Sequence, residues 1–272
     1  MYDSKINNCE ELRKIAKSIR KNIVEMVYEA QSGHPGGALS VTDILTVLYF
    51  NQMNISASEP KKEDRDRLVL SKGHASAALY ATLAEKGFFE KEKLMSFRKV
   101  DGELQGHPDM NKVIGVDMTT GSLGQGLSAA NGMALAGKLD KKDFRVYCIV
   151  GDGEIQEGQI WEACMSASHY KLDNLCVIVD NNNLQIDGHV DEVMNVYPLR
   201  EKFESFGFEV FEVDGHNIEE LIEVFEKAKN IKESPVAIIA KTIKGKGVSF
   251  MENQVKWHGK APNKEEFEGI IW

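Results

Sequence analysis

The sequence predicts an α/β fold in which a mostly parallel β-sheet carries helices on both faces. Four runs are apolar and rich in β-branched residues: "FRVYCIVGDG" (144–153), "LCVIVDNN" (175–182), "FEVFEVDG" (208–215) and "PVAIIAKT" (235–242). Continuous apolar runs that are spaced by helical segments are typical of parallel strands buried on both faces. We therefore expect one domain over the 272 residues, with an N-terminal helical extension and a C-terminal tail.

The other elements follow from helical periodicity. Residues from about 9 to 30 form an amphipathic helix, because apolar side chains recur at helical spacing: Leu12, Ile15, Ala16, Ile19, Ile23, Met26 and Val27. A second helix is predicted from about Ser40 to Met53. After the charged loop 59–67, the run "LVLS" predicts a strand, and 72–87 predicts a helix. Asn217 begins a later helix with Glu220 at capping-box spacing, and its apolar stripe is Ile218, Leu221, Ile222 and Phe225.

Composition excludes several classes of function. A net charge of -9 and a pI near 5.4 argue against binding to nucleic acid or to a membrane surface, because both attract basic proteins. No apolar run reaches the roughly 20 residues that span a bilayer, and the N-terminus has no apolar signal core, so we expect a cytoplasmic protein. The four cysteines contain no C-x-x-C pair, which favours neither a disulfide framework nor a zinc site.

Polar residues follow two of the predicted strands, at the point where each strand ends. Asp152 lies between two glycines after the first run, and Asn181–Asn183 follow the second. Ligand sites of parallel sheets lie beyond the carboxyl ends of the strands, so these side chains can meet if the strands are neighbours. Carboxylate, amide and carbonyl oxygens suit Mg²⁺ or Ca²⁺, and Mg²⁺ commonly bridges protein oxygens to phosphates, which implies a diphosphate-bearing cofactor. The alternative is that both segments are ordinary turns.

"GDG" followed after 27 residues by "NN" resembles the thiamine diphosphate binding motif of transketolases, 2-oxoacid dehydrogenases and related enzymes. Further segments are similar to transketolases in particular: "SGHPGGALS" (32–40), "LSKGHASAALY" (70–80), "LQGHPDM" (104–110), "TTGSLGQGLSAANGMALA" (119–136) and "WHGKAP" (257–262). The resemblance covers only the first of the family's three domains. It implies the N-terminal, diphosphate-binding subunit of a split transketolase, with a separate C-terminal subunit that carries the pyrimidine-binding and third domains, in a heterotetramer.

The same resemblance implies roles for individual residues. Asp152, Asn182 and the backbone carbonyl of Leu184 would hold the metal, although the third asparagine leaves an ambiguity of one position. Gly153 would contact the diphosphate. Gly121, Ser122 and Leu123 resemble the loop that contacts the cofactor, with Ser122 where many family members carry proline. Glu157 matches a carboxylate that links the two cofactor sites of the dimer, while a solvated glutamate at a helix start is the competing interpretation.

Four of the seven histidines lie in glycine-containing segments of the match. An imidazole can donate to a phosphate, or can exchange a proton with a sugar hydroxyl near neutral pH. The resemblance implies that His74 contacts the diphosphate and that His34 and His258 face both cofactor and substrate. It implies that His107 binds the carbonyl or hydroxyl of the donor sugar. His216 is expected to be a helix-entry residue.

The activity that the resemblance implies is the transfer of a two-carbon ketol unit from a ketose phosphate to an aldose phosphate. The glutamate that activates the cofactor belongs to the pyrimidine-binding domain, which this sequence does not match, so we expect the chain to be inactive alone. The alternatives are the α-subunit of a 2-oxoacid dehydrogenase, a sugar-phosphate synthase, a transketolase for a sulfonated or branched sugar, or a non-catalytic module. A nicotinamide-binding fold is disfavoured, because "GSLGQG" has G-x-x-G-x-G spacing.

Overall fold

The predicted strands form a single parallel sheet at the centre of the molecule. The computed structural model describes residues 4–186 and 188–272. Its strands are β1 (Arg67–Leu70), β2 (Val146–Gly151), β3 (Leu175–Asn181), β4 (Glu209–Asp214) and β5 (Val236–Lys241), in the order β1-β2-β3-β5-β4. All neighbouring pairs are parallel, and Gly151 lies opposite Asp180. The expected α/β fold is confirmed, and the two strands that end in "GDG" and "NNN" are neighbours.

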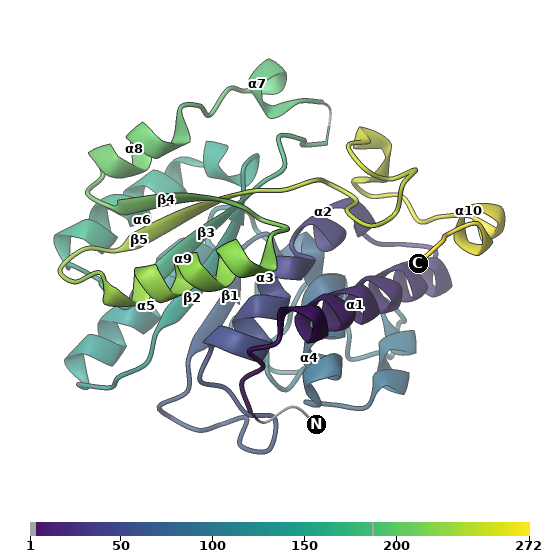
Figure 1. Cartoon of the computed structure of the whole chain (residues 1–272), viewed down its shortest axis with the longest axis horizontal. Coiled ribbons are helices and arrows are strands. Elements are labelled where there is room, and N and C mark those ends of the chain that lie inside the picture. The colour runs from purple at the N-terminus through teal and green to yellow at the C-terminus, as the bar shows by residue number, and fades with distance from the viewer. Residues whose placement is uncertain (1–3, 187) are drawn as a thin grey trace.

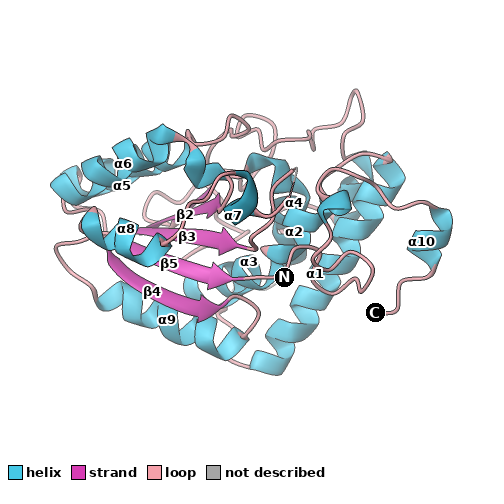
Figure 2. Ribbon diagram, turned by 90° about the horizontal axis from the view of Figure 1, so that it is seen from above, coloured by secondary structure: helices cyan, strands magenta, loops and turns pink. Residues whose placement is uncertain are grey.

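Helices cover both faces of this sheet, so the strands separate two hydrophobic cores (Figure 1, Figure 2). One core contains helices α1 (Cys9–Ala30), α3 (Thr42–Val47), α4 (Ser76–Lys86) and α9 (Ile218–Asn230). The other contains α5 (Gly126–Leu139), α6 (Gly158–His169) and α8 (Leu199–Ser205). In β3, Cys176 and Ile178 enter the first core, whereas Val177 and Val179 enter the second. Burial on both faces explains why β2, β3 and β5 are continuously apolar, whereas the edge strand β4 alternates exposed and buried residues, contrary to the expectation for that run.

The first two predicted helices are present close to their expected bounds, the second as α3 and the turn that follows it, but the sequence did not predict a separate helix before Ser40. The chain after α1 forms α2 (Pro35–Ser40), then α3, and then a π-helical turn over Leu48–Gln52. Pro35 takes the first helical position, where its missing N–H costs nothing. The following glycines suggest a loop, but tertiary packing requires them: a Cβ on Gly36 would lie 2.8 Å from the Trp257 carbonyl oxygen. Helix α2 therefore ends at Ser40, where the predicted helix was expected to begin.

Of the two hydrogen bonds that define the predicted capping box of α9, one is present. The Asn217 side chain accepts a hydrogen bond from the Glu220 backbone N–H, whereas the Glu220 carboxylate accepts from the Asp214 N–H and from the Asn217 amide. The short elements are the 3₁₀ turns Gly73–Ala75, Lys91–Ser96, Glu154–Gln156 and Val255–Trp257, and the helices α7 (Val190–Val193) and α10 (Lys264–Glu268). Helix α10 lies beside α1 (Figure 1), where Tyr28 and Phe267 stack with ring centroids 4.1 Å apart.

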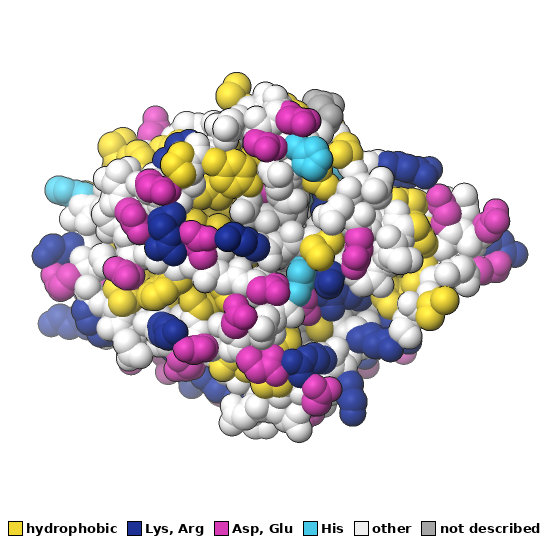
Figure 3. Space-filling model, turned by 45° about the horizontal axis from the view of Figure 1, so that its top comes forward, with side chains coloured by type: hydrophobic (Ala, Val, Ile, Leu, Met, Phe, Trp, Pro, Cys, Tyr) yellow, Lys and Arg dark blue, Asp and Glu magenta, His cyan; other side chains and the backbone are white. Residues whose placement is uncertain are grey.

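The surface charges and the state of the cysteines agree with what the composition predicts. The face in Figure 3 has basic and acidic side chains interspersed, with no broad basic field. Within the described part of the chain, no helix is long and apolar enough to cross a membrane. The four cysteines are free thiols, and Cys148, Cys164 and Cys176 are buried, as their apolar surroundings predicted.

Candidate functional site

A cavity of about 380 Å³ opens at the carboxyl ends of the strands. It lies where the rule for parallel sheets places a ligand. Eleven of the twelve residues singled out from the sequence line it: His34, His74, His107, Gly121, Leu123, Asp152, Gly153, Glu157, Asn182, Leu184 and His258. Ser122 is exposed and is not part of the lining. Segments far apart in the sequence therefore converge on one volume.

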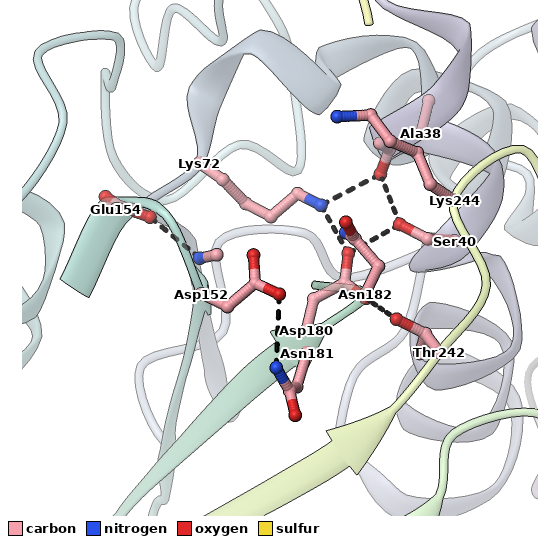
Figure 4. Close-up of polar contacts among 12 residues, drawn as sticks. Ala38, Ser40, Lys72, Asp152, Glu154, Asp180, Asn181, Asn182, Thr242 and Lys244 are labelled. Carbon is pink, nitrogen blue, oxygen red and sulfur yellow. Dashed lines mark hydrogen bonds and ion pairs between the residues drawn. The ribbon is translucent and has the colours of Figure 1, made fainter. Parts of the chain in front are cut away.

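The Asp152 carboxylate is buried beside the end of β3 (Figure 4). Its Oδ1 accepts from the Gly153 N–H at 2.8 Å. Its Oδ2 accepts from the Asn181 amide at 3.1 Å and from the Asn183 N–H at 2.5 Å. Burial, followed by the charge of Asp180, raises the pKa of Asp152 to about 6 despite these donors. Oδ1 keeps a lone pair that a cation can take.

The structure separates the three asparagines by their surroundings. Asn181 turns its amide nitrogen to Asp152 and to the Tyr197 hydroxyl, at 3.1 and 2.7 Å. Asn183 has φ +58°, a conformation that asparagine tolerates, and its amide contacts Tyr197 and His189. Of the three, only Asn182 lines the cavity. Its Oδ1 accepts a single hydrogen bond, from the Leu184 N–H at 3.1 Å.

Lys244, in the loop after β5, lines the same cavity. Its buried ammonium donates to the Leu184 carbonyl at 3.1 Å and lies 2.9 Å from His258 Nδ1. Burial, followed by the charge of Lys72, lowers the pKa of Lys244 to about 8. Sequence reasoning missed this residue, although it follows a strand end, which was the signal that identified Asp152.

The oxygen donors fit a hard divalent cation. One carboxylate, one amide oxygen and one backbone carbonyl line the cavity together, and each keeps a lone pair beyond its hydrogen bonds within the chain. Across residues 4–186 and 188–272, no cluster of three or more His, Cys, Asp or Glu side chains is arranged to hold a metal. A metal here would therefore need amide and backbone oxygens, which suit Mg²⁺ or Ca²⁺ better than zinc.

A buried ion pair supports the floor of the cavity (Figure 4). Lys72, just after β1, pairs with Asp180 and donates to the Gly37 carbonyl at 2.9 Å. Asp180 also accepts from the hydroxyls of Ser40, at 2.6 Å, and Thr242. Burial alone would raise the pKa of Asp180, but Lys72 and the two hydroxyls bring it below its usual range. The network thereby joins β3 and α2 to the segments that directly follow β1 and β5. The sequence did not indicate this network.

Three of the four histidines meet on one side of the cavity. The ring centroids of His34, His74 and His258 are 5.3 to 5.4 Å apart. Burial, followed by nearby cationic side chains, lowers the pKa of His34 to about 4 and that of His258 to about 3, and places the pKa of His74 well below its usual value. All three are neutral near pH 7. They therefore act through hydrogen bonds rather than as cations.

His107 stands apart from these three, at the exposed mouth of the cavity, where it packs against the loop over residues 119–124. Gly121 has φ +153°, and a Cβ there would lie 3.2 Å from the His107 ring. Glu154 fixes the other end of the loop, because its buried carboxylate accepts from the Gly124 N–H at 3.0 Å, the Ser71 hydroxyl at 2.6 Å and the Gly151 N–H at 3.0 Å. Burial raises the pKa of Glu154. This carboxylate ties the loop to the ends of β1 and β2.

Gly73 makes a close backbone contact that a side chain would break. A Cβ there would lie 2.9 Å from the Gly121 nitrogen and 3.0 Å from the Thr120 carbonyl carbon. We expect Gly73→Ala to lower the free energy of unfolding by about 1–3 kcal/mol, because backbone must shift to admit the methyl group. Gly132→Ala in α5 is the control, since nothing lies within 4 Å of the added Cβ. Urea unfolding of both variants measures the difference, and equal stabilities would contradict the close contact.

Three further sequence expectations have specific outcomes. Glu157 is an exposed residue at the cavity rim that precedes α6 and makes no side-chain cap. The Gly153 N–H donates a hydrogen bond to Asp152 Oδ1 in this structure. A Cβ on Gly153 would lie 3.1 Å from the Gln185 side chain. His216 precedes the cap of α9, but it also bridges two elements: Nδ1 lies 2.7 Å from Asp43, and Nε2 accepts from the Ile243 N–H at 2.8 Å.

The chain is similar to known proteins over nearly its whole length. The family model described as "Transketolase, thiamine diphosphate binding domain" matches residues 12–270. The chain is 44% identical over 252 residues to one of the subunits of apulose-4-phosphate transketolase from Phocaeicola vulgatus, covering 93% of this chain and 89% of that protein. It is 44% identical over 261 residues to "6-deoxy-6-sulfo-D-fructose transketolase subunit SqwG" of Clostridium sp., covering 96% and 95%.

Longer relatives match over part of their length. Human transketolase is 45% identical over 263 residues, which cover 96% of this chain but 41% of that protein. The crystal structure of transketolase from Campylobacter jejuni superposes with a TM-score of 0.90 at 39% identity, covering 95% of this chain and 42% of that one. Because the family model spans nearly all of the chain and relatives of comparable length are more than 40% identical, the chain belongs to the transketolase family, and its residues 12–270 match the thiamine diphosphate binding domain of that family.

Proposed function

We propose that residues 1–272 act as the N-terminal subunit of a two-chain transketolase, which transfers a two-carbon ketol unit from a ketose phosphate to an aldose phosphate. One observation carries the proposal: Asp152, Asn182 and the Leu184 carbonyl share a cavity with Lys244 and three neutral histidines. Oxygen atoms that can bind a metal thus lie beside the Lys244 ammonium and the histidine rings. The ammonium and the ring N–H groups can donate to phosphate and sugar oxygens. The two-chain enzyme would act in the cytoplasm, the location expected from the N-terminal sequence.

The oxygen donors would hold Mg²⁺ or Ca²⁺, and the metal with Lys244 and His74 would hold the diphosphate of thiamine diphosphate. Bound thiamine diphosphate supplies a thiazolium carbon and an electron sink for cleaving and forming carbon–carbon bonds. Helix N-termini and backbone N–H groups at strand ends favour the same anion. Gly121 and Leu123, which also line the cavity, would contact the cofactor. Ser122 lies outside the lining, so it would act only through the loop backbone.

Three histidines of this chain would bind and orient the sugar. His34 and His258 face the interior of the cavity, and His107 stands at its mouth. Because His34 and His258 have pKa values of about 4 and 3, they stay uncharged and can orient hydroxyl or carbonyl oxygens without repelling a metal. His107 would contact the oxygen on which negative charge develops when the ketose is cleaved.

A separate C-terminal chain would complete the site. This part of the proposal rests on two relatives whose names contain "subunit" and which this chain covers at 89% and 95% of their length. That chain would carry the pyrimidine-binding and third domains and would supply the glutamate that activates the cofactor. Two of each chain, in a heterotetramer, would make two sites, with Glu157 at the rim facing the junction between them.

The purified chain is expected to have no transketolase activity until the C-terminal chain is added. The assay follows transfer of a two-carbon unit from a ketose phosphate to an aldose phosphate, with thiamine diphosphate and Mg²⁺ present. Native mass spectrometry should give two copies of each chain in the active species. Turnover by the chain alone would refute the two-chain proposal. Release of carbon dioxide from a 2-oxo acid, without ketol transfer, would favour a 2-oxoacid dehydrogenase subunit instead.

A further inference from the structure

Arg98 lies directly behind His34, outside the cavity lining. It follows the 3₁₀ turn Lys91–Ser96 and has φ +57°. Its guanidinium packs flat against the chain at Gly106, where a Cβ would lie 2.9 Å from Cζ. A residue with any side chain at that position would displace the guanidinium. Glycine at position 106 therefore leaves the space that the Arg98 guanidinium occupies beside the site.

The guanidinium makes hydrogen bonds but no ion pair. Its Nη1 donates to the Ser32 hydroxyl at 3.2 Å, and its Nη2 lies 3.3 Å from His34 Nδ1. Nε is buried and has no hydrogen-bond partner within the described residues. No carboxylate lies within salt-bridge distance of Arg98 anywhere in residues 4–186 and 188–272. An ion pair therefore does not explain why a charged group is kept half-buried here.

The contact with His34 has only one chemical interpretation. A guanidinium stays protonated and has donors but no acceptor. His34 Nδ1 must then be the acceptor, so the single proton of the neutral ring sits on Nε2. A second proton on Nδ1 would point at the cation, and burial with the charge of Arg98 lowers the pKa of His34 to about 4. The other titratable groups around the ring are His74, His107, Lys244 and His258.

We propose that Arg98 is a positioning residue that fixes His34 as the Nε2–H tautomer, so that His34 presents a hydrogen-bond donor, and not a proton acceptor, to an oxygen of the bound sugar. The identity of that oxygen as part of a sugar rests on the proposed function. The tautomer does not, because it is a property of the free chain.

His258 provides an internal comparison. Its Nδ1 lies 2.9 Å from the Lys244 amine, so its ring is also held through Nδ1. An amine can accept a hydrogen bond when it loses its proton, whereas a guanidinium cannot. The tautomer of His34 is therefore imposed wherever its ring is neutral, whatever the protonation state of nearby amines. A lysine at position 98 would not be an equivalent substitute, because it lacks the planar fork that reaches both Ser32 and His34.

The direct test is ¹⁵N NMR of the histidine rings in the full chain near neutral pH, without cofactor or partner. In the wild type, His34 Nε2 is expected to be protonated and Nδ1 unprotonated. In Arg98→Met the two nitrogens are expected to share the proton, while Lys99→Met, which removes an exposed neighbouring cation, leaves the signals unchanged. A proton on Nδ1 in the wild type, or an unaltered tautomer in Arg98→Met, would overturn the proposal.

A kinetic experiment on the assembled two-chain enzyme separates positioning from a structural role. Arg98→Met is expected to lower kcat/KM for the sugar by about 2- to 5-fold, because the donated hydrogen bond is lost for the part of the population whose proton sits on Nδ1. The affinity for thiamine diphosphate and the unfolding transition are expected to stay near wild type, and Arg98→Lys is expected to recover only part of the rate. Equal losses of cofactor affinity and of kcat/KM would indicate a structural role. If His34 shows the expected tautomer but the two-chain assembly transfers no ketol unit, the proposed function is refuted and the proposal for Arg98 stands.

Discussion

Asp152→Asn is expected to weaken the joint binding of Mg²⁺ and thiamine diphosphate by about a hundredfold or more. Asp152 is the one charged group among the three proposed metal ligands, since the others are an amide oxygen and a backbone carbonyl. Asparagine has nearly the same size, but its amide nitrogen would face an N–H donor of Gly153 or Asn183. A loss of about 1–3 kcal/mol in unfolding free energy should accompany the change. Titration calorimetry with Mg²⁺ and thiamine diphosphate measures the affinity.

Asp191→Asn is the matched control for this experiment. Asp191 is exposed at the start of α7 and does not line the cavity, so the same loss of one charge should leave the affinity within about twofold. Circular dichroism confirms that both variants are folded. If Asp152→Asn binds the metal and cofactor as tightly as the control does, the proposed metal site is wrong.

Lys72→Met is expected to lower the free energy of unfolding by about 3–5 kcal/mol. Asp180 is fully buried, and the substitution removes its only ion-pair partner within the described residues. The hydroxyls of Ser40 and Thr242 remain, but they cannot neutralise a carboxylate. Because the folded-state pKa of Asp180 is depressed, the stabilisation is present above its ordinary pKa and is lost as the pH falls through the folded-state value. Urea unfolding at neutral pH gives the change.

Two further variants show whether the buried charge is the cause. Lys171→Met breaks an exposed ion pair with Glu233 and should change the stability by less than about 1 kcal/mol. Adding Asp180→Asn to Lys72→Met removes the unpaired charge and should recover part of the lost stability. If the double variant is no more stable than Lys72→Met, lost packing of the lysine stem explains the result better than electrostatics.

The sheet and the polar residues at two of its strand ends could be predicted from the sequence because they depend on local pattern, whereas the four histidines, Glu157 and the loop over residues 121–123 were implied by the family resemblance. Apolar runs gave the strands, and polar residues directly after two of them gave Asp152 and the asparagines. The start of α2 could not be predicted in this way. Gly36 and Gly37 indicate a loop unless one knows that α2 packs against the chain near Trp257, which is a contact between distant segments.

The supporting residues were missed for a related physical reason. Lys72, Lys244 and Arg98 are ordinary basic residues in the sequence, and their roles arise from partners far along the chain. The partner of Lys72 is Asp180, that of Lys244 is Leu184, and that of Arg98 is His34. His216 was interpreted from its neighbours as a helix-entry residue, whereas its ring joins Asp43 to the Ile243 backbone. Side chains that act through long-range contacts leave no periodic signal.

The close contact between Gly36 and the Trp257 carbonyl has a consequence for biosynthesis. It brings the segment with His34 against the segment with His258, and these are among the earlier and later parts of the chain to leave the ribosome. A nascent chain released only as far as β5 already contains all five strands of the sheet described here, yet it lacks His258. Competence to capture the coenzyme should therefore arise late in translation, after the sheet can fold.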